Sequence, residues 1–104
     1  SLIGEWVSEN EIKLKFIFSE NEITIIIPTN NSNLILEGTY FSDSSRNINT
    51  IDIKSIENIS YSLHGIYKLI GKNKIKISKF SKKNKTRPIS FEKNNYYTLT
   101  KRNK

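Results

Sequence analysis

The chain of 104 residues contains no cysteine, no methionine and a single histidine. The absence of cysteine excludes disulfide bonds, thiolate metal sites and cysteine nucleophiles, and it leaves the redox compartment open. Because methionine is absent, we expect that the native start has been removed by processing or by excision from a longer protein. We expect an extracytoplasmic location only if the removed part was a signal segment.

Long hydrophobic runs are absent as well. No stretch approaches the ~18 to 20 consecutive apolar residues that a membrane-spanning helix needs, so no such span is predicted. No segment keeps a helical period of 3.6 residues for more than a few positions. A chain of this length buries ~65% of the surface that it exposes when unfolded, which is enough for one core. The sequence therefore predicts a single domain over residues 1–104, without a linker or a repeat.

Residues that carry catalytic chemistry are scarce. His64, the sole histidine, has no serine partner at a spacing typical of a nucleophile and its base. Among the carboxylates, Glu37 and Asp52 fall within predicted strands, and the sequence does not show that they converge. Gly-rich phosphate loops, metal-ligand clusters and nucleophile elbows are missing. The sequence predicts a protein that is not an enzyme and uses neither a metal nor a cofactor, and we interpret His64 as a strand-face histidine.

Charge is distributed unevenly along the chain. Residues 1–57 carry four basic and nine acidic side chains, a net charge of −5, whereas residues 58–104 carry thirteen basic side chains and one acidic, a net charge of +12. A basic segment of this kind favours anionic partners. The alternative is compositional, because Ile, Asn and Lys dominate the sequence as they do in products of AT-rich genomes. Lysines on outward strand faces are ordinary solvated residues.

Apolar and polar residues alternate with a period of two through most of the chain, which is typical of half-buried strands. Eight strands are predicted, over residues 3–7, 12–18, 23–27, 34–41, 51–53, about 60–70, 74–80 and 96–102. Eight is the number of strands at which a closed barrel just accommodates its own side chains or one small ligand. Closure also removes the two unpaired edges that an open sheet would expose.

Scattered residues at both ends of the chain resemble a known family. The start, Leu2-Ile3-Gly4-Glu5-Trp6, carries the Gly-x-Trp that opens lipocalin-type barrels. The last forty residues contain Gly65-Ile66-Tyr67, a turn at Gly71, Arg87-Pro88-x-x-Phe91 and Leu99-x-x-Arg102. Together they resemble the small bacterial lipocalin-like domains first noted in planctomycete proteins. The resemblance implies an all-β fold, a small eight-stranded antiparallel up-and-down barrel. It also implies that Trp6 lies across the barrel floor with Arg102 packed over its ring, a contact worth ~0.5 to 2 kcal/mol.

Three classes of function remain open, and the first is a binding domain. Its ligand would be a small hydrophobic or amphiphilic molecule held in the barrel or at its mouth. The predicted lining comprises Phe16, Leu36, Tyr40, Leu63, Tyr67 and Ile77, of which the two tyrosines would supply hydroxyl groups. The alternative is that large side chains fill the barrel interior completely.

The second class is a basic surface that binds an anionic partner such as nucleic acid, a nucleotide or an acidic glycan. The densest cluster of cations consists of Lys79, Lys82, Lys83, Lys85 and Arg87, with Phe80 and Tyr96 or Tyr97 as stacking partners. The third class is a protein-interaction domain in which the barrel presents its loops to another protein. The sequence by itself does not separate the third class from the first.

Overall fold

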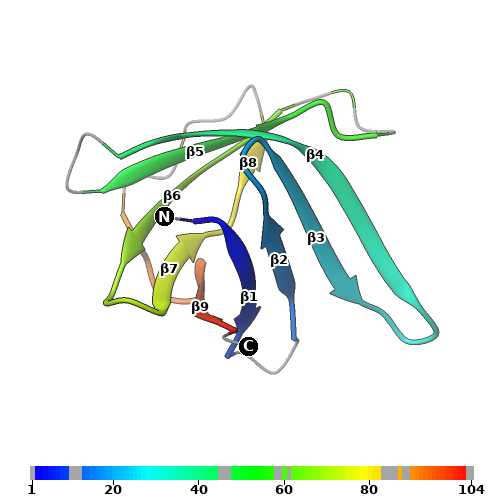
Figure 1. Cartoon of the computed structure of the whole chain (residues 1–104), viewed down its shortest axis with the longest axis horizontal. Helices are drawn as coiled ribbons and strands as arrows, with labels where there is room; N and C mark the ends of the chain where they lie inside the picture. The colour runs from blue at the N-terminus through cyan, green and yellow to red at the C-terminus, as the bar shows by residue number, and fades with distance from the viewer. Residues whose placement is uncertain are drawn as a thin grey trace.

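The computed structural model is an all-β protein (Figure 1). It describes residues 2–9, 13–44, 48–57, 60, 62–82, 87 and 90–102, with the Lys82 side chain excepted. Within these ranges the strands are β1 (Gly4–Ser8), β2 (Lys15–Phe18), β3 (Glu22–Pro28), β4 (Asn33–Asp43), β5 (Asn49–Lys54), β6 (Leu63–Leu69), β7 (Lys74–Ser78), β8 (Ser81–Lys82) and β9 (Tyr96–Lys101).

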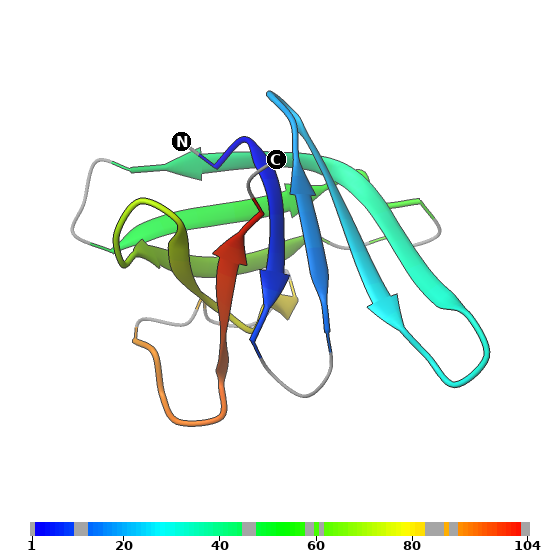
Figure 2. The ribbon, with the colours of Figure 1, turned by 60° about the horizontal axis from the view of Figure 1, so that its bottom comes forward.

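The strands close into an up-and-down barrel. Each strand from β1 to β6 pairs antiparallel with the next one along the chain, and β9 pairs with both β7 and β1. Figure 2 shows β9 lying between β7 and β1. Because the first and last strands are neighbours, no edge runs the full length of the sheet. The predicted eight-stranded antiparallel barrel is confirmed, with the two-residue β8 as a continuation of β7.

A β-bulge separates β7 from β8. Tyr67 of β6 pairs with Ile77, and His64 pairs with Ser81, so three residue steps on β6 face four steps on the opposite strand. The single strand predicted over residues 74–80 is therefore interrupted after Ser78. The bulge brings Phe80 against the buried core, where it packs as a partly exposed side chain.

The indole of Trp6 lies at the closed end of the barrel and is fully buried. Its Nε1 donates a hydrogen bond to the carbonyl oxygen of Leu2 at 2.9 Å. Lys101, which faces Trp6 in the β1–β9 register, places Nζ 5.5 Å from the centre of the ring. The lysine stem crosses Gly4, where an added Cβ would lie 2.7 Å from Lys101 Cε. The Gly-x-Trp pattern thus leaves space for the cation over the indole.

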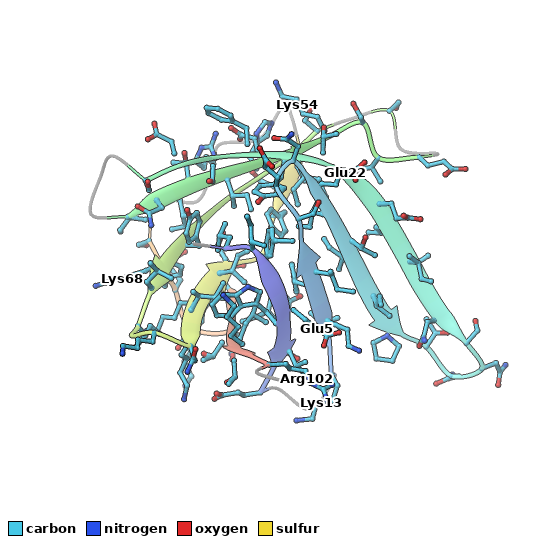
Figure 3. The ribbon with its side chains drawn as sticks, in the orientation of Figure 1. Glu5, Lys13, Glu22, Lys54, Lys68 and Arg102 are labelled. Atoms are coloured by element: carbon cyan, nitrogen blue, oxygen red, sulfur yellow. The ribbon has the colours of Figure 1, made fainter. Side chains whose placement is uncertain are left out.

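The cation over Trp6 is Lys101 and not Arg102, which corrects the expectation from the lipocalin resemblance by one residue. Successive side chains on a strand point to opposite faces, so Lys101 shares the face of Trp6 and Arg102 does not. Arg102 instead places Nε 3.8 Å from Glu5 Oε2, and its backbone N–H donates to the Glu5 carbonyl oxygen at 2.8 Å (Figure 3). The side-chain contact lies on the outside of the barrel, whereas the backbone hydrogen bond extends the pairing of β1 with β9.

The core of the barrel is tightly filled. Apolar side chains with 1% exposure or less come from four strands, and they are Trp6, Ile51, Ile53, Ile75, Ile77 and Leu99. They form one cluster with the other buried apolar residues. Because apolar and polar residues alternate along the strands, the side chains on one face of each strand point into this cluster, as expected for a small barrel.

The other end of the barrel is open because the first part of β4 does not pair with β5. β4 pairs with β3 over Asn33–Thr39, but with β5 only over Thr39–Asp43. The β3–β4 hairpin therefore projects away from the remaining strands, as both ribbon views show (Figures 1 and 2). Gly38 lies at the divergence, where a Cβ would come within 2.7 Å of the Lys54 carbonyl oxygen.

Candidate functional site

An apolar cavity of about 250 Å³ lies at the open end of the barrel. Its lining residues are aliphatic or aromatic, and they are Leu14, Phe16, Ile25, Ile27, Leu36, Leu63, Phe80 and Tyr97. The hydroxyl of Tyr97 is the single polar side-chain group in this set. Such a surface favours an apolar molecule with at most one hydrogen-bonding group near Tyr97.

Three adjacent strands supply one wall of the cavity. In the register Phe16 of β2 faces Ile25 of β3, which faces Leu36 of β4, so these side chains form a row on the inner face. Ile27 continues the inner face of β3 by the period of two. Phe16 and Ile25 belong to the buried core, whereas Ile27 and Leu36 are only partly buried, and the cavity lies beside them where β4 diverges from β5.

The opposite wall depends on the β-bulge. Phe80 lies over Gly65, where an added Cβ would be 2.9 Å from the phenyl ring and 3.0 Å from Ser78 Oγ. Ser78 is itself buried, and its Oγ accepts a hydrogen bond from the backbone N–H of Ile66 at 2.9 Å. The hydroxyl thus satisfies a backbone group beside the bulge. The absence of a side chain at Gly65 allows Phe80 to reach the cavity.

The phenol of Tyr97 is the polar feature of the cavity. Desolvation by burial raises its pKa above the ordinary value for tyrosine, so the hydroxyl keeps its proton at neutral pH. Lys79 places Nζ 5.7 Å from the centre of the Tyr97 ring. The backbone N–H of Lys79 donates a hydrogen bond to the Asn95 carbonyl oxygen at 2.9 Å. The cavity therefore has a hydrogen-bond donor beside an exposed cation.

The structure divides the six predicted lining residues among three places. Phe16, Leu36 and Leu63 line the apolar cavity. Tyr40 and Tyr67 instead line a second hollow, of about 300 Å³, towards the closed end of the barrel. Ile77 is completely buried in the filled core. The core of the barrel is therefore filled, and a hollow lies on each side of it, so both alternatives raised by the sequence apply to parts of the barrel.

Tyr40 does not offer a free hydroxyl. Its OH donates to the carbonyl oxygen of Ser19 at 2.6 Å, and its ring packs edge-on against Phe18 at 5.0 Å between centres. Burial raises the pKa of Tyr40 as well, with smaller contributions from Tyr67 and Glu20. The cavity residues that are not among the six predicted lining residues are Leu14, Ile25, Ile27, Phe80 and Tyr97. The period of two indicated Ile27, whereas the bulge that places Phe80 has no signal in the sequence.

A polar cluster lies on the outer wall of β5 and β6. Asp52 and His64 face each other in the register, and His64 Nδ1 lies 2.6 Å from Asp52 Oδ1. The same carboxylate oxygen accepts a hydrogen bond of 2.6 Å from Arg87. Arg87 also donates to the carbonyl oxygens of Ile51 at 3.3 Å and Gly65 at 2.9 Å. The guanidinium thus attaches residue 87 to two strands.

This cluster lowers the pKa of Asp52. Burial by itself would raise that pKa, but the hydrogen bonds from His64 and Arg87 and the charge of Arg87 outweigh burial. The Asp52 carboxylate accepts a hydrogen bond from His64 Nδ1, so this nitrogen carries the proton when the His64 ring is neutral. No hydroxyl group among the described residues is hydrogen-bonded to the imidazole. The sequence analysis missed the carboxylate partner of His64, because the β5–β6 register is not encoded by a tight turn.

The predicted anion-binding cluster is only partly described. Lys83 and Lys85 lie outside the described residues, and of Lys82 only the backbone is described. Arg87 contacts Asp52 and two carbonyl groups, and Lys79 lies beside Tyr97.

Another basic feature is described on the outer face of β6 and β7. There Lys68 directly faces Lys76, whose Nζ lies 4.9 Å from the centre of the Tyr96 ring. Lys68 projects outward from β6 (Figure 3).

The described part of the chain holds neither a cluster of metal ligands nor a helix that could span a membrane. No three histidine or acidic side chains there are grouped so as to hold a metal ion. No helix in the same part has the length and apolar character needed to cross a membrane.

Comparison with known proteins adds no relative. No family model, curated protein or solved structure matches the chain. Only the geometry of the cavity and of the surfaces therefore indicates a function.

Proposed function

We propose that the protein is a non-enzymatic, lipocalin-like binding domain for a small hydrophobic or amphiphilic molecule. The observation that carries this proposal is the apolar cavity of about 250 Å³ at the open end of the barrel, beside a filled core. A folded domain of this size usually closes such a space, because interiors pack as densely as organic crystals. A cavity of about 150 Å³ lined by similar side chains holds benzene, so this one suits a slightly larger apolar group.

The polar groups suggest how an amphiphilic ligand would be oriented. Its apolar part would contact Phe16, Leu36 and Leu63 inside the cavity, and a polar head would lie near the Tyr97 hydroxyl and Lys79. The Asp52 and His64 pair lies on the outer wall, separated from the cavity by the sheet. That separation supports a role in binding without catalysis.

Binding of an environment-sensitive apolar dye tests the proposal. We expect saturable fluorescence enhancement with little dependence on salt, and displacement of the dye by the natural ligand in extracts of the source. Leu63→Trp should fill the cavity and reduce dye affinity at least tenfold. Leu69→Trp is the matched control, because Leu69 lies on the same face of the same strand but lines the second hollow. An absence of dye uptake by the folded protein, or equal uptake by Leu63→Trp, would contradict the proposal.

A basic surface for anions is the second candidate. Like charges directly opposite on a sheet are destabilising, and yet Lys68 faces Lys76. An anion bound between these lysines would remove the repulsion, and Tyr96 lies beside Lys76 as a stacking group. Against this candidate, Arg87 of the predicted cluster is already engaged by Asp52.

A further inference from the structure

The outer edge of β4 is exposed at the start of the strand. Residues 33–38 pair with β3 on one side, and no pairing with another described strand occurs on the other side. In both ribbon views β4 forms the outer side of the projecting hairpin (Figures 1 and 2). A barrel normally leaves no such edge, because an unpaired strand offers its backbone to other chains.

The backbone groups that face this edge follow from the ladder. Tyr40 donates its N–H to the Asn21 carbonyl oxygen, so even-numbered residues of β4 direct their backbone groups towards β3. The odd-numbered residues Asn33, Ile35 and Glu37 therefore direct both N–H and C=O towards the open side. Each of these residues has one donor and one acceptor available to a new strand.

The side chains on this edge are unusually apolar. Leu34 is 49% exposed and Ile35 is 53% exposed, although they lie on opposite faces of the strand. Natural edge strands are commonly protected by lysine, proline or a bulge. Between residues 33 and 37 the only charged side chain is Glu37. The segment is thus well suited to pair with another strand.

We propose that a second copy of this chain pairs with the edge, β4 against β4, in an antiparallel arrangement centred on Ile35. Hydrogen-bonded pairs must join odd-numbered residues, and a two-fold axis requires each pair to be reciprocal. The register centred on Ile35 satisfies both conditions. Ile35 then faces Ile35 of the second copy, and Asn33 faces Glu37 of the second copy.

Charge and apolar contacts agree with this register. Each Glu37 lies opposite an asparagine, so the two carboxylates are not placed against each other. Leu34 lies opposite Leu36 of the second copy on the inner face, while the two Ile35 side chains meet on the outer face. Pairing therefore covers both exposed apolar residues of the segment and uses the backbone groups of Asn33, Ile35 and Glu37.

The dimer should be weak. A single short strand contributes less than the ~800 Å² per partner of a standard interface. We therefore expect a reversible monomer–dimer equilibrium in sedimentation velocity over roughly 10 μM to 1 mM protein, a range that brackets weak association. A monomer throughout that range would overturn the proposal.

Ile35→Lys should weaken dimerisation at least tenfold, because it places two lysines against each other at the two-fold axis. The matched control is Phe41→Lys. Phe41 lies on the same strand and the same face and is 68% exposed, but its backbone already pairs with Asp52 of β5. If the molecules associate through exposed apolar side chains in general, Phe41→Lys should weaken dimerisation as much as Ile35→Lys does. That result would overturn the proposal. Circular dichroism and thermal unfolding verify that both variants fold.

The register of the proposed β4–β4 pairing can be tested separately by changing the charges at residues 33 and 37. Asn33→Glu places a carboxylate opposite Glu37 of the second copy and should weaken the dimer several-fold. Adding Glu37→Lys to that variant pairs opposite charges at both ends of the interface, and dimerisation should return at least to the original level. If the double variant dimerises no better than Asn33→Glu alone, the proposed register is wrong.

Discussion

At the scale of single residues, the closed end of the barrel depends on the contact between Trp6 and Lys101. The indole is completely buried, and its edge is held by the hydrogen bond to Leu2. Lys101 then covers the ring with an aliphatic stem and an ammonium group, which adds a cation–π contact to the packing. This contact joins β1 to β9, the two strands that close the barrel.

Lys101→Ala should therefore lower the free energy of unfolding by ~0.5 to 2 kcal/mol, the usual range for such a contact. Arg102→Ala is the neighbouring control, because its exposed pair with Glu5 contributes ~0 to 1 kcal/mol. Trp6→Ala should cost ~3 to 5 kcal/mol through lost packing. Urea unfolding followed by circular dichroism measures all three. A larger loss in Arg102→Ala than in Lys101→Ala would show that the cation over the ring has been assigned to the wrong residue.

Asp52 makes stability depend on pH. Its folded pKa is lower than its unfolded pKa, so its ionised form stabilises the fold above the unfolded value of about 4. That contribution is lost as the pH falls from about 4 through the lower folded pKa. The free energy of unfolding, measured at a series of pH values, should fall more steeply in this window for the wild type than for Asp52→Asn. Parallel curves would contradict the assignment.

His64 tests whether the outer cluster takes part in binding. The side chain lies on the outer wall of the sheet, whereas the cavity lies inside the barrel. His64→Ala should therefore change dye affinity by no more than a few-fold. A loss of two orders of magnitude in any measured activity, with the fold intact, would reveal an active site at the Asp52 and His64 pair.

At the scale of elements, the β-bulge between β7 and β8 connects the fold to the cavity. The extra residue turns Phe80 inward, and Gly65 on the opposite strand leaves room for its ring. Gly65→Ala should push the ring out of place, lower the free energy of unfolding by ~1 to 3 kcal/mol and weaken dye binding. In a protein that already carries Phe80→Ala, Gly65→Ala should lower the free energy of unfolding by less. Additive losses in the double variant would show that the two residues do not interact.

Much of this arrangement could be predicted from the sequence, because the period of two assigns each strand residue to one face. That rule identified Phe16, Leu36 and Leu63 as inward-facing, and these residues do line the cavity. It could not separate them from Ile77, which faces inward but lies in the filled part of the barrel. The difference depends on where β4 diverges from β5.

The pairing of His64 with Asp52 and the bulge beneath Phe80 depend on register. Residues far apart in the chain set both features, and no local turn signal encodes them. The lipocalin resemblance placed the cation over Trp6 at Arg102, whereas the β1–β9 register assigns it to Lys101. Alternation alone could not correct that position, because it does not fix which residues of two strands face each other.

At the scale of the whole molecule, barrel closure places the acidic half of the chain beside the basic half. Glu9 pairs with Lys74 at 3.1 Å, and Asp52 pairs with Arg87 at 2.6 Å, so each pair joins an acid from residues 1–57 to a base from residues 58–104. The contact between Glu5 and Arg102 does the same. Part of the uneven charge in the sequence is therefore neutralised within the fold, and the remaining positive charge includes the facing lysines on β6 and β7.

The remaining positive charge leads to a prediction that distinguishes a function of the cavity from a function of the basic surface. Labelled single-stranded DNA of two unrelated sequences should bind weakly at physiological ionic strength in fluorescence anisotropy, with equal affinity for both sequences and a decline as salt increases. Neutralising Lys82, Lys83 and Lys85 together should reduce the slope of that decline, while dye binding to the cavity should not change. Tight, salt-sensitive binding of DNA that falls with these substitutions, combined with no uptake of dye, would reverse the ranking. The basic surface would then be the functional site, and the hollow end of the barrel would be a packing defect without a ligand.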